Sequence, residues 1–223
     1  MHLFLTDRTI CPRCGPGFGL ILLAHEVLDR RVFEGDLGCS NCREQYPVRA
    51  GFADLRPPPR TSLVQTQSDT SSEPVELEET VRLGALLGVT EGPGTLLIKG
   101  PKARFAQAIT DLIGGVEVVA EGLDLLPAAE TEGVSRLLAG RRIPFMSDTF
   151  RAVLMSGEIG SSDLDEAARV VGNRGRVVVL DAPRGRSGQL EALGFTILLE
   201  EGGVLVGRSE ASPSLPLIPL RGL

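Results

Sequence analysis

The second half of the chain alternates short apolar runs with segments of helical periodicity. The runs typical of buried strands are residues 95–98, 116–120, 134–138, 152–155 and 176–180. Residues 103–113 and 164–171, between these runs, space their apolar positions as helices do. Residues 195–199 and 203–207 flank a Gly-containing turn and indicate a hairpin. The pattern predicts an α/β fold with a mostly parallel sheet, covered on both faces and closed by an antiparallel hairpin.

The first part of the chain is organised differently, because it shows short strands and no helical pattern. We expect strands at residues 19–23, 31–37 and 45–49. Pro57-Pro58-Pro59 then stops regular structure, and the residues up to 74 lack apolar periodicity. The predicted division is a small β domain over 1–56, a linker over 57–74, an α/β domain over 75–210 and a Pro-rich tail over 211–223.

An amphipathic helix is predicted at the start of the second domain. Residues 75–87 carry acidic side chains in their first half and apolar side chains at helical spacing. We expect Val81, Leu83, Leu86 and Leu87 to face a core.

The four cysteines of the chain form two C-x2-C pairs, Cys11 with Cys14 and Cys39 with Cys42. Two such pairs in one short segment can direct four thiolates at one Zn²⁺. A site with four thiolate ligands has no open coordination position, so the predicted zinc is structural. Two disulfides are the alternative interpretation.

Composition narrows the possible functions. A formal net charge of −6 argues against unspecific binding of nucleic acid by the whole chain. The chain holds no run of eighteen apolar residues, which predicts no transmembrane segment, and its first residues are too polar for a signal peptide. We therefore expect a cytoplasmic protein.

Further residues around the cysteines carry a resemblance. Tyr46-Pro47-Val48 follows the second pair, and Gly51-Phe52 and Leu55 come next. With these residues, the segment 3–55 resembles the Trm-one-twelve-like family of zinc-ribbon proteins. The resemblance implies a partner subunit that stabilises and activates methyltransferases acting on tRNA, rRNA and release factors.

A second resemblance covers about residues 92–208. It is carried by the segments 142–153, which includes Pro144-Phe145, and 165–179, which includes Arg169-Val170-Val171 and a Gly-containing turn. Their order and spacing resemble class I S-adenosylmethionine-dependent methyltransferases. This resemblance implies a Rossmann-like, doubly wound sheet and an S-adenosylmethionine site at the carboxyl ends of its strands.

The chain departs from that family where the cofactor would bind. The family's Gly-x-Gly-x-Gly loop corresponds to Gly100-Pro101-Lys102-Ala103-Arg104, which keeps one glycine, and the acidic residue that ends the family's first strand corresponds to Ile98. Of the cofactor-binding residues that the resemblance implies, Gly100 and Glu121 remain. Side chains at positions 102 and 104 would fill space that the cofactor needs. The second half also has no histidine, and we assign no catalytic residue.

These observations leave three functional hypotheses. The first is a non-catalytic methyltransferase-like subunit that has a structural zinc ribbon and acts through protein partners. The second is an active S-adenosylmethionine-dependent methyltransferase with its activator domain in cis. The third is a phosphate- or RNA-binding module, with RNA or the translation machinery as partner, whose basic residues are Lys99, Lys102, Arg104, Arg141 and Arg142.

Overall fold

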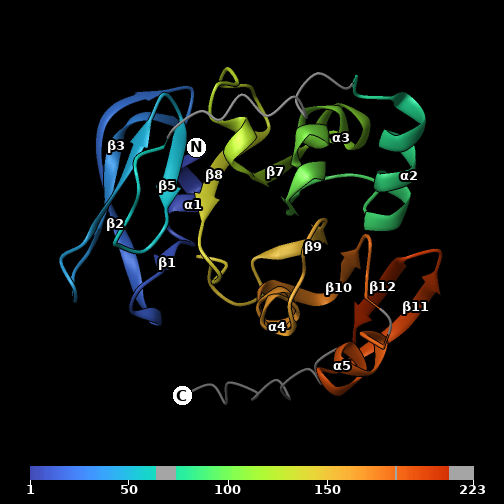
Figure 1. Cartoon of the computed structure of the whole chain (residues 1–223). Helices are drawn as coiled ribbons and strands as arrows, with labels where there is room; N and C mark the ends of the chain where they lie inside the picture. The colour runs from blue at the N-terminus through green and yellow to red at the C-terminus, as the bar shows by residue number, and fades with distance from the viewer. Residues whose placement is uncertain (64–73, 184, 211–223) are drawn as a thin grey trace, which may run out of the picture.

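One large sheet runs through the whole molecule. The computed structural model describes residues 1–63, 74–183 and 185–210, and over these residues the strands form a twelve-stranded sheet in the order β1-β2-β3-β4-β5-β8-β7-β6-β9-β10-β12-β11 (Figure 1). The strands are β1 (Ile10–Cys11), β2 (Gly15–Leu28), β3 (Arg31–Cys39), β4 (Gln45–Arg49), β5 (Phe52–Leu55), β6 (Gly94–Lys99), β7 (Val116–Glu121), β8 (Val134–Ala139), β9 (Phe150–Met155), β10 (Val171–Val179), β11 (Phe195–Glu201) and β12 (Val204–Ser209). The helices are α1 (Leu3–Thr6), α2 (Leu77–Leu87), α3 (Ala106–Ile113), α4 (Ser161–Val170) and α5 (Ser187–Ala192), with 3₁₀ turns at η2 (Pro101–Phe105) and η3 (Leu123–Leu125).

The second half has the predicted Rossmann-like, doubly wound arrangement. Strands β8, β7, β6, β9 and β10 run parallel to one another, whereas β12 runs antiparallel to both β10 and β11. The chain builds outward from β6 through β7 to β8, and then returns to place β9 on the other side of β6. The carboxyl ends of β6 and β9 therefore flank the point where the strand order reverses, which is where sheets of this kind bind ligands.

Helices cover the two faces of this parallel sheet (Figure 1). On one face, Leu83 of α2 and Ile109 of α3 pack on strand residues such as Leu96 and Val118. On the other face, Leu164 of α4 and Leu190 of α5 join a core that contains the alternate strand residues, Leu97, Val119, Val153 and Val177. Because both faces are covered, the central strands are apolar at nearly every position, which is the pattern that predicted them.

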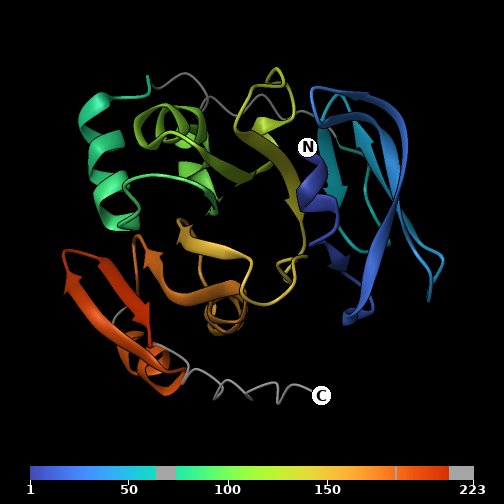
Figure 2. The ribbon, with the colours of Figure 1, turned by 180° about the vertical axis from the view of Figure 1, so that it is seen from behind.

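The cysteine-bearing segment extends the same sheet. Strands β2 to β5 form an antiparallel meander, and β5 then pairs in parallel with β8 through Ala53 with Leu137, Asp54 with Leu138 and Leu55 with Ala139. Figure 2 shows β5 beside β8 from the opposite side. The core of the segment is continuous with the core under α4. The segment therefore packs on its own chain, which the sequence left open.

The structure corrects some local expectations. Val81 is 48% exposed, because the buried face of α2 is formed by Thr80, Leu83, Gly84 and Leu87 and position 81 points away from it. The predicted helix over 103–113 begins as the 3₁₀ turn η2 and continues as α3. Elements α1, β1, β5 and α5 were not predicted. The tail 211–223 and residues 64–73 of the predicted linker lie outside the described residues.

Candidate functional site

The four cysteines converge on one point. The Sγ atoms of Cys11 and Cys42 lie 3.7 Å apart, those of Cys14 and Cys39 lie 3.9 Å apart, and all four Sγ atoms lie within 4.8 Å of one another. With Zn–S bonds of about 2.3 Å, a tetrahedral site places its sulfur atoms roughly 3.8 Å apart. A disulfide bond would require about 2.05 Å. The donor set and spacing therefore fit a tetrahedral zinc ion, and these cysteines could bind one.

The sheet register brings the two pairs together. Cys11 ends β1 and pairs with Gly15 at the start of β2, while Leu20 of the same strand pairs with Cys39 at the end of β3. Each pair thus lies in a tight turn at the same end of the meander. In the part of the chain that the structure describes, no other group of three or more His, Cys, Asp or Glu side chains lies close enough to hold a metal ion.

Two neighbouring side chains contact the sulfur atoms. The Tyr46 hydroxyl lies 3.5 Å from Cys11 Sγ, and Asn41 Nδ2 donates to Cys14 Sγ at 3.3 Å. Burial acts to raise the pKa of the Cys11 thiol, but hydrogen bonds from Tyr46 and from backbone amides outweigh it and lower the pKa to about 7. The lowered pKa favours the thiolate form of Cys11, which is the form that binds a metal ion. Tyr46 belongs to the Tyr-Pro-Val motif of the sequence, but its contact with the site was not predicted.

At the carboxyl edge of the parallel sheet, the two predicted cofactor-binding residues lie side by side. The backbone N–H of Gly100 donates to the carbonyl oxygen of Glu121 at 3.0 Å. The Glu121 side chain forms an ion pair with Lys99, and its Oε1 atom lies 2.7 Å from Lys99 Nζ. Burial raises the pKa of the Glu121 carboxyl, although the Lys99 ammonium acts in the opposite direction. A carboxylate that could hold a ribose is thus already in an ion pair.

Hydrogen bonds join the chain segments at the carboxyl ends of β6 and β9. Both the backbone N–H and the hydroxyl of Ser156, which follows β9, donate to the carbonyl oxygen of Lys99, at 3.0 and 3.1 Å. The Ser156 hydroxyl also accepts from the backbone N–H of Lys102 at 3.0 Å. Gly100 has φ +87°, and a Cβ there would overlap the Ser156 carbonyl oxygen. The loops after the two strands therefore touch each other directly.

The basic side chains of the altered loop turn away from this contact. Lys102 Nζ forms an ion pair with Glu79 Oε1 of α2 at 2.6 Å, and the Arg104 guanidinium lies over the Phe105 ring at 5.2 Å. Since Lys99 and Lys102 are both paired with carboxylates, part of the positive charge expected at this edge is neutralised. Binding of RNA or phosphate here stays a prediction.

One observation points toward a ligand at this edge. Glu121 Oε2 is buried and has no hydrogen-bond partner among the described residues. A buried acceptor without a partner is costly, and a hydroxyl donor would satisfy it. The Ser156 contact lies beside this acceptor at the reversal point of the sheet, where sheets of this kind bind ligands.

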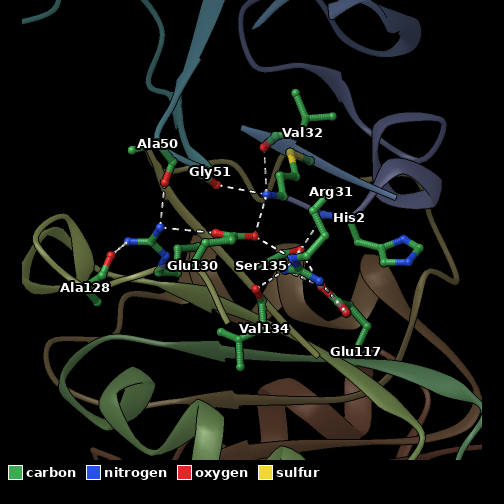
Figure 3. A network of polar contacts seen from close by, with 12 residues as sticks. His2, Arg31, Val32, Ala50, Gly51, Glu117, Ala128, Glu130, Val134 and Ser135 are labelled. Atoms are coloured by element: carbon green, nitrogen blue, oxygen red, sulfur yellow. Dashed lines mark hydrogen bonds and ion pairs between the residues drawn. The ribbon is translucent and has the colours of Figure 1, made fainter. Parts of the chain in front are cut away.

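A buried polar network joins the cysteine-bearing segment to the parallel sheet (Figure 3). The Arg31 side chain lies between Glu130 and Glu117, with Nε 2.6 Å from Glu130 Oε1 and Nη1 3.3 Å from Glu117 Oε1. Arg136 Nη2 donates to Glu130 Oε2 at 3.1 Å and to the carbonyl oxygen of Ala50 at 2.7 Å. The side chains of Arg31, Glu117, Glu130 and Arg136 are all less than a tenth exposed. The sequence analysis missed this network, although Glu117 and Arg136 are charged residues within predicted apolar strands.

Comparisons with known proteins give similar folds only. No family model matches the chain, and no curated protein matches it. Similar solved structures include a protein assigned as an S-adenosyl-L-methionine-dependent methyltransferase from Methanococcus maripaludis, with 10% identity, 61% of this chain and 85% of that chain covered, and a TM-score of 0.46.

Two further solved structures have comparable scores. The YcgJ protein from Bacillus subtilis is 13% identical, with 60% of this chain and 100% of that chain covered and a TM-score of 0.45. The second is a complex between the Haloferax volcanii Trm112 methyltransferase activator and a protein assigned as a methyltransferase. The matched chain of this complex is 12% identical, with 59% of this chain and 89% of that chain covered and a TM-score of 0.45. These likenesses are too distant to assign an activity to this chain.

None of the helices in the described ranges is long and apolar enough to cross a lipid bilayer.

Proposed function

We propose that this protein is a non-catalytic, methyltransferase-like binding or structural subunit that carries a structural zinc ion and acts through protein partners. The observation that carries the proposal is the direct contact between the loops after β6 and β9, through Ser156 and the backbone of Lys99 and Lys102. In a doubly wound sheet these loops diverge to admit a ligand. Here the backbone N–H of Lys102 bonds to the Ser156 hydroxyl, which supports a crevice too narrow for the cofactor.

The zinc ion has a stabilising role in this proposal. Cys11, Cys14, Cys39 and Cys42 would supply all four ligands, which leaves no position for water or substrate. A metal bound in this way contributes its binding free energy to folding. It would fix the ends of β1 and β3 and, through β2 to β5, the edge that pairs with β8.

An active S-adenosylmethionine-dependent methyltransferase is the second candidate. The observation in its favour is the buried, unpartnered Oε2 atom of Glu121, which could accept a ribose hydroxyl. In this case Gly100 and Glu121 would hold the cofactor, the loop at Ser156 would have to open, and the ribbon on β8 would serve as an activator in cis.

Titration calorimetry with S-adenosylmethionine separates the two candidates. We expect no binding by the wild-type chain at millimolar cofactor, and the same result for Glu121→Ala. Micromolar binding that Glu121→Ala abolishes would refute the non-catalytic proposal and support the methyltransferase. Each sample is checked for zinc content and for an intact thermal transition, so that absence of binding is measured on folded protein.

A further inference from the structure

Strand β2 leaves one long edge of the sheet without a partner. Its inner edge pairs with β3 from Leu20 to Leu28, whereas β1 covers only Gly15 and Gly19 on the outer side. The backbone N–H of Leu20 still donates to the carbonyl oxygen of Thr9, at 3.2 Å. From Ile21 to Leu28, no strand within the described residues pairs with the outer edge of β2. Figures 1 and 2 show β2 at the opposite end of the sheet from β11.

This edge strand is unusually apolar. Ile21 is 59% exposed, Leu23 51%, Val27 43% and Leu28 58%. Proteins usually protect exposed edge strands with Lys, Pro or inward charges, because free N–H and C=O groups invite another strand. Residues Leu20 to Leu28 contain no Lys, Arg or Pro. The apolar side chains and the free backbone groups together form a surface that fits an added β-strand.

The charge pattern favours a second copy of this chain as the occupant. The chain carries a net charge of −6, so two copies repel each other except where their surfaces are neutral. The segment Leu20 to Ala24 has no ionisable side chain, and Glu26 is the only acidic residue from Gly15 to Leu28. In an antiparallel pair around a twofold axis near Ala24, neutral segments meet and no like charges face each other.

The other edges of the sheet do not offer the same contact. On the far side of the meander, β5 is an interior strand that pairs with both β4 and β8 of the same chain. The outer strand β11 ends in Glu200 and Glu201, and pairing of β2 with β11 of another copy would be a head-to-tail contact that builds open chains. Pairing of β2 with β2 closes after two copies and leaves no free β2 edge.

We propose that the outer edge of β2 is a self-association surface, through which two copies of this chain join their sheets by antiparallel pairing of β2 with β2. The proposal is independent of the zinc and cofactor assignments. The free backbone groups that would pair belong to Leu22 and Ala24, since strand residues alternate and the N–H of Leu20 already points outward to Thr9.

Mass measurement of the full chain by sedimentation equilibrium tests the proposal. From about 1 to about 100 µM, mass action should drive the wild type toward twice the 23.7 kDa of one chain. The double variant Leu23→Lys with Ala24→Lys places like charges at the axis and should remain at 23.7 kDa, as should Leu23→Glu with Ala24→Glu. An equal mixture of the two double variants should recover the doubled mass, because opposite charges then face each other.

Two further variants keep the outcome interpretable. Leu198→Lys replaces a 43% exposed leucine on β11 and should leave the doubled mass unchanged. Ala24→Pro removes an outward N–H without adding charge and should also prevent the doubled mass. The proposal is overturned by a monomeric wild type throughout the concentration range, by a doubled mass that survives the β2 variants, or by a mixture that stays at the mass of one chain.

Discussion

The cysteine-bearing segment over residues 1–56, which we call the ribbon, and the carboxyl edge of the parallel sheet hold the two candidate sites of this chain, and they differ in how their groups are arranged. In the ribbon, all four cysteines meet with the spacing of a tetrahedral zinc site. At the carboxyl edge, Glu121 is bound to Lys99 and the loop at Gly100 is closed against Ser156. A metal site is defined by the ligands that are present, whereas a cofactor site also requires space.

The ribbon and the carboxyl edge also differ in how they are held in place. The ribbon is held by pairing of β5 with β8, by the buried network around Arg31 and Glu130, and by a core continuous with that under α4. The carboxyl edge is held by contacts between the ends of β6 and β9 and by the ion pair of Lys102 with Glu79 of α2. Loss of the metal should therefore disturb the ribbon and the sheet edge together, while a change at the carboxyl edge should remain local.

The largest effect is expected from loss of a zinc ligand. Cys39→Ser should lower zinc content from one ion per chain to near zero, because structural sites need all four ligands. The thermal midpoint should fall by at least about 10 °C, since structural zinc contributes several kcal/mol and each kcal/mol shifts the midpoint by roughly 2–4 °C at this chain length. Elemental analysis and calorimetry measure both quantities.

Ser40→Ala is the matched control, because Ser40 is exposed and lies between the second pair of cysteines. It should keep the metal and the midpoint. A wild-type chain that holds no zinc, or whose midpoint does not respond to a chelator, would contradict the structural role of the site.

An intermediate effect is expected from the network that joins the two regions. Glu130→Gln removes the carboxylate shared by Arg31 and Arg136, whose side chains are 7% and 3% exposed. Removing one partner from a buried ionic network costs about 3 kcal/mol, which denaturant unfolding would show as a lower midpoint concentration. Glu132→Gln, at an exposed position two residues away, should change stability by less than about 0.5 kcal/mol. Equal effects of the two variants would mean that the network does not hold the ribbon.

The sequence predicted the parts of this molecule that rest on local patterns. The cysteine pairs and the central strands are local signals, because ligand spacing and apolar runs are visible within a few residues. Strand β5 was missed because Phe52–Leu55 is short and contains a charged residue; it pairs with β4 on one side and with the sequence-distant β8 on the other. Pairing between segments so distant in sequence leaves no local pattern.

The carboxyl edge likewise depends on a contact between segments that are distant in sequence. The sequence showed that glycines were replaced by Lys102 and Arg104, and predicted an obstructed site. In the structure Lys102 turns toward Glu79, and the contact across this edge is made by the Ser156 hydroxyl. A serine after a strand carries no signal of such a contact, which depends on how closely β6 and β9 approach.

The smallest effect, and the one that tests the state of the carboxyl edge most directly, concerns Glu121. Its folded-state pKa is raised by burial above the ordinary value, so the folded state holds the proton more tightly than the unfolded state does. The stability that this proton contributes is fully present below the unfolded pKa and is lost as pH rises through the folded pKa. Glu121→Gln cannot titrate, so the stability of the wild type relative to this variant should fall as pH rises from acid to neutral.

Denaturant unfolding of both proteins across that pH range measures the difference. Ser156→Ala disturbs the same edge without removing an ionisable group, and its difference from the wild type should stay constant with pH. A difference for Glu121→Gln that grows with rising pH would mean that the ion pair with Lys99 outweighs burial and favours the carboxylate. In that case the edge would hold a charged acceptor at neutral pH, as a ribose-binding site requires, and its contrast with the ribbon would be reduced.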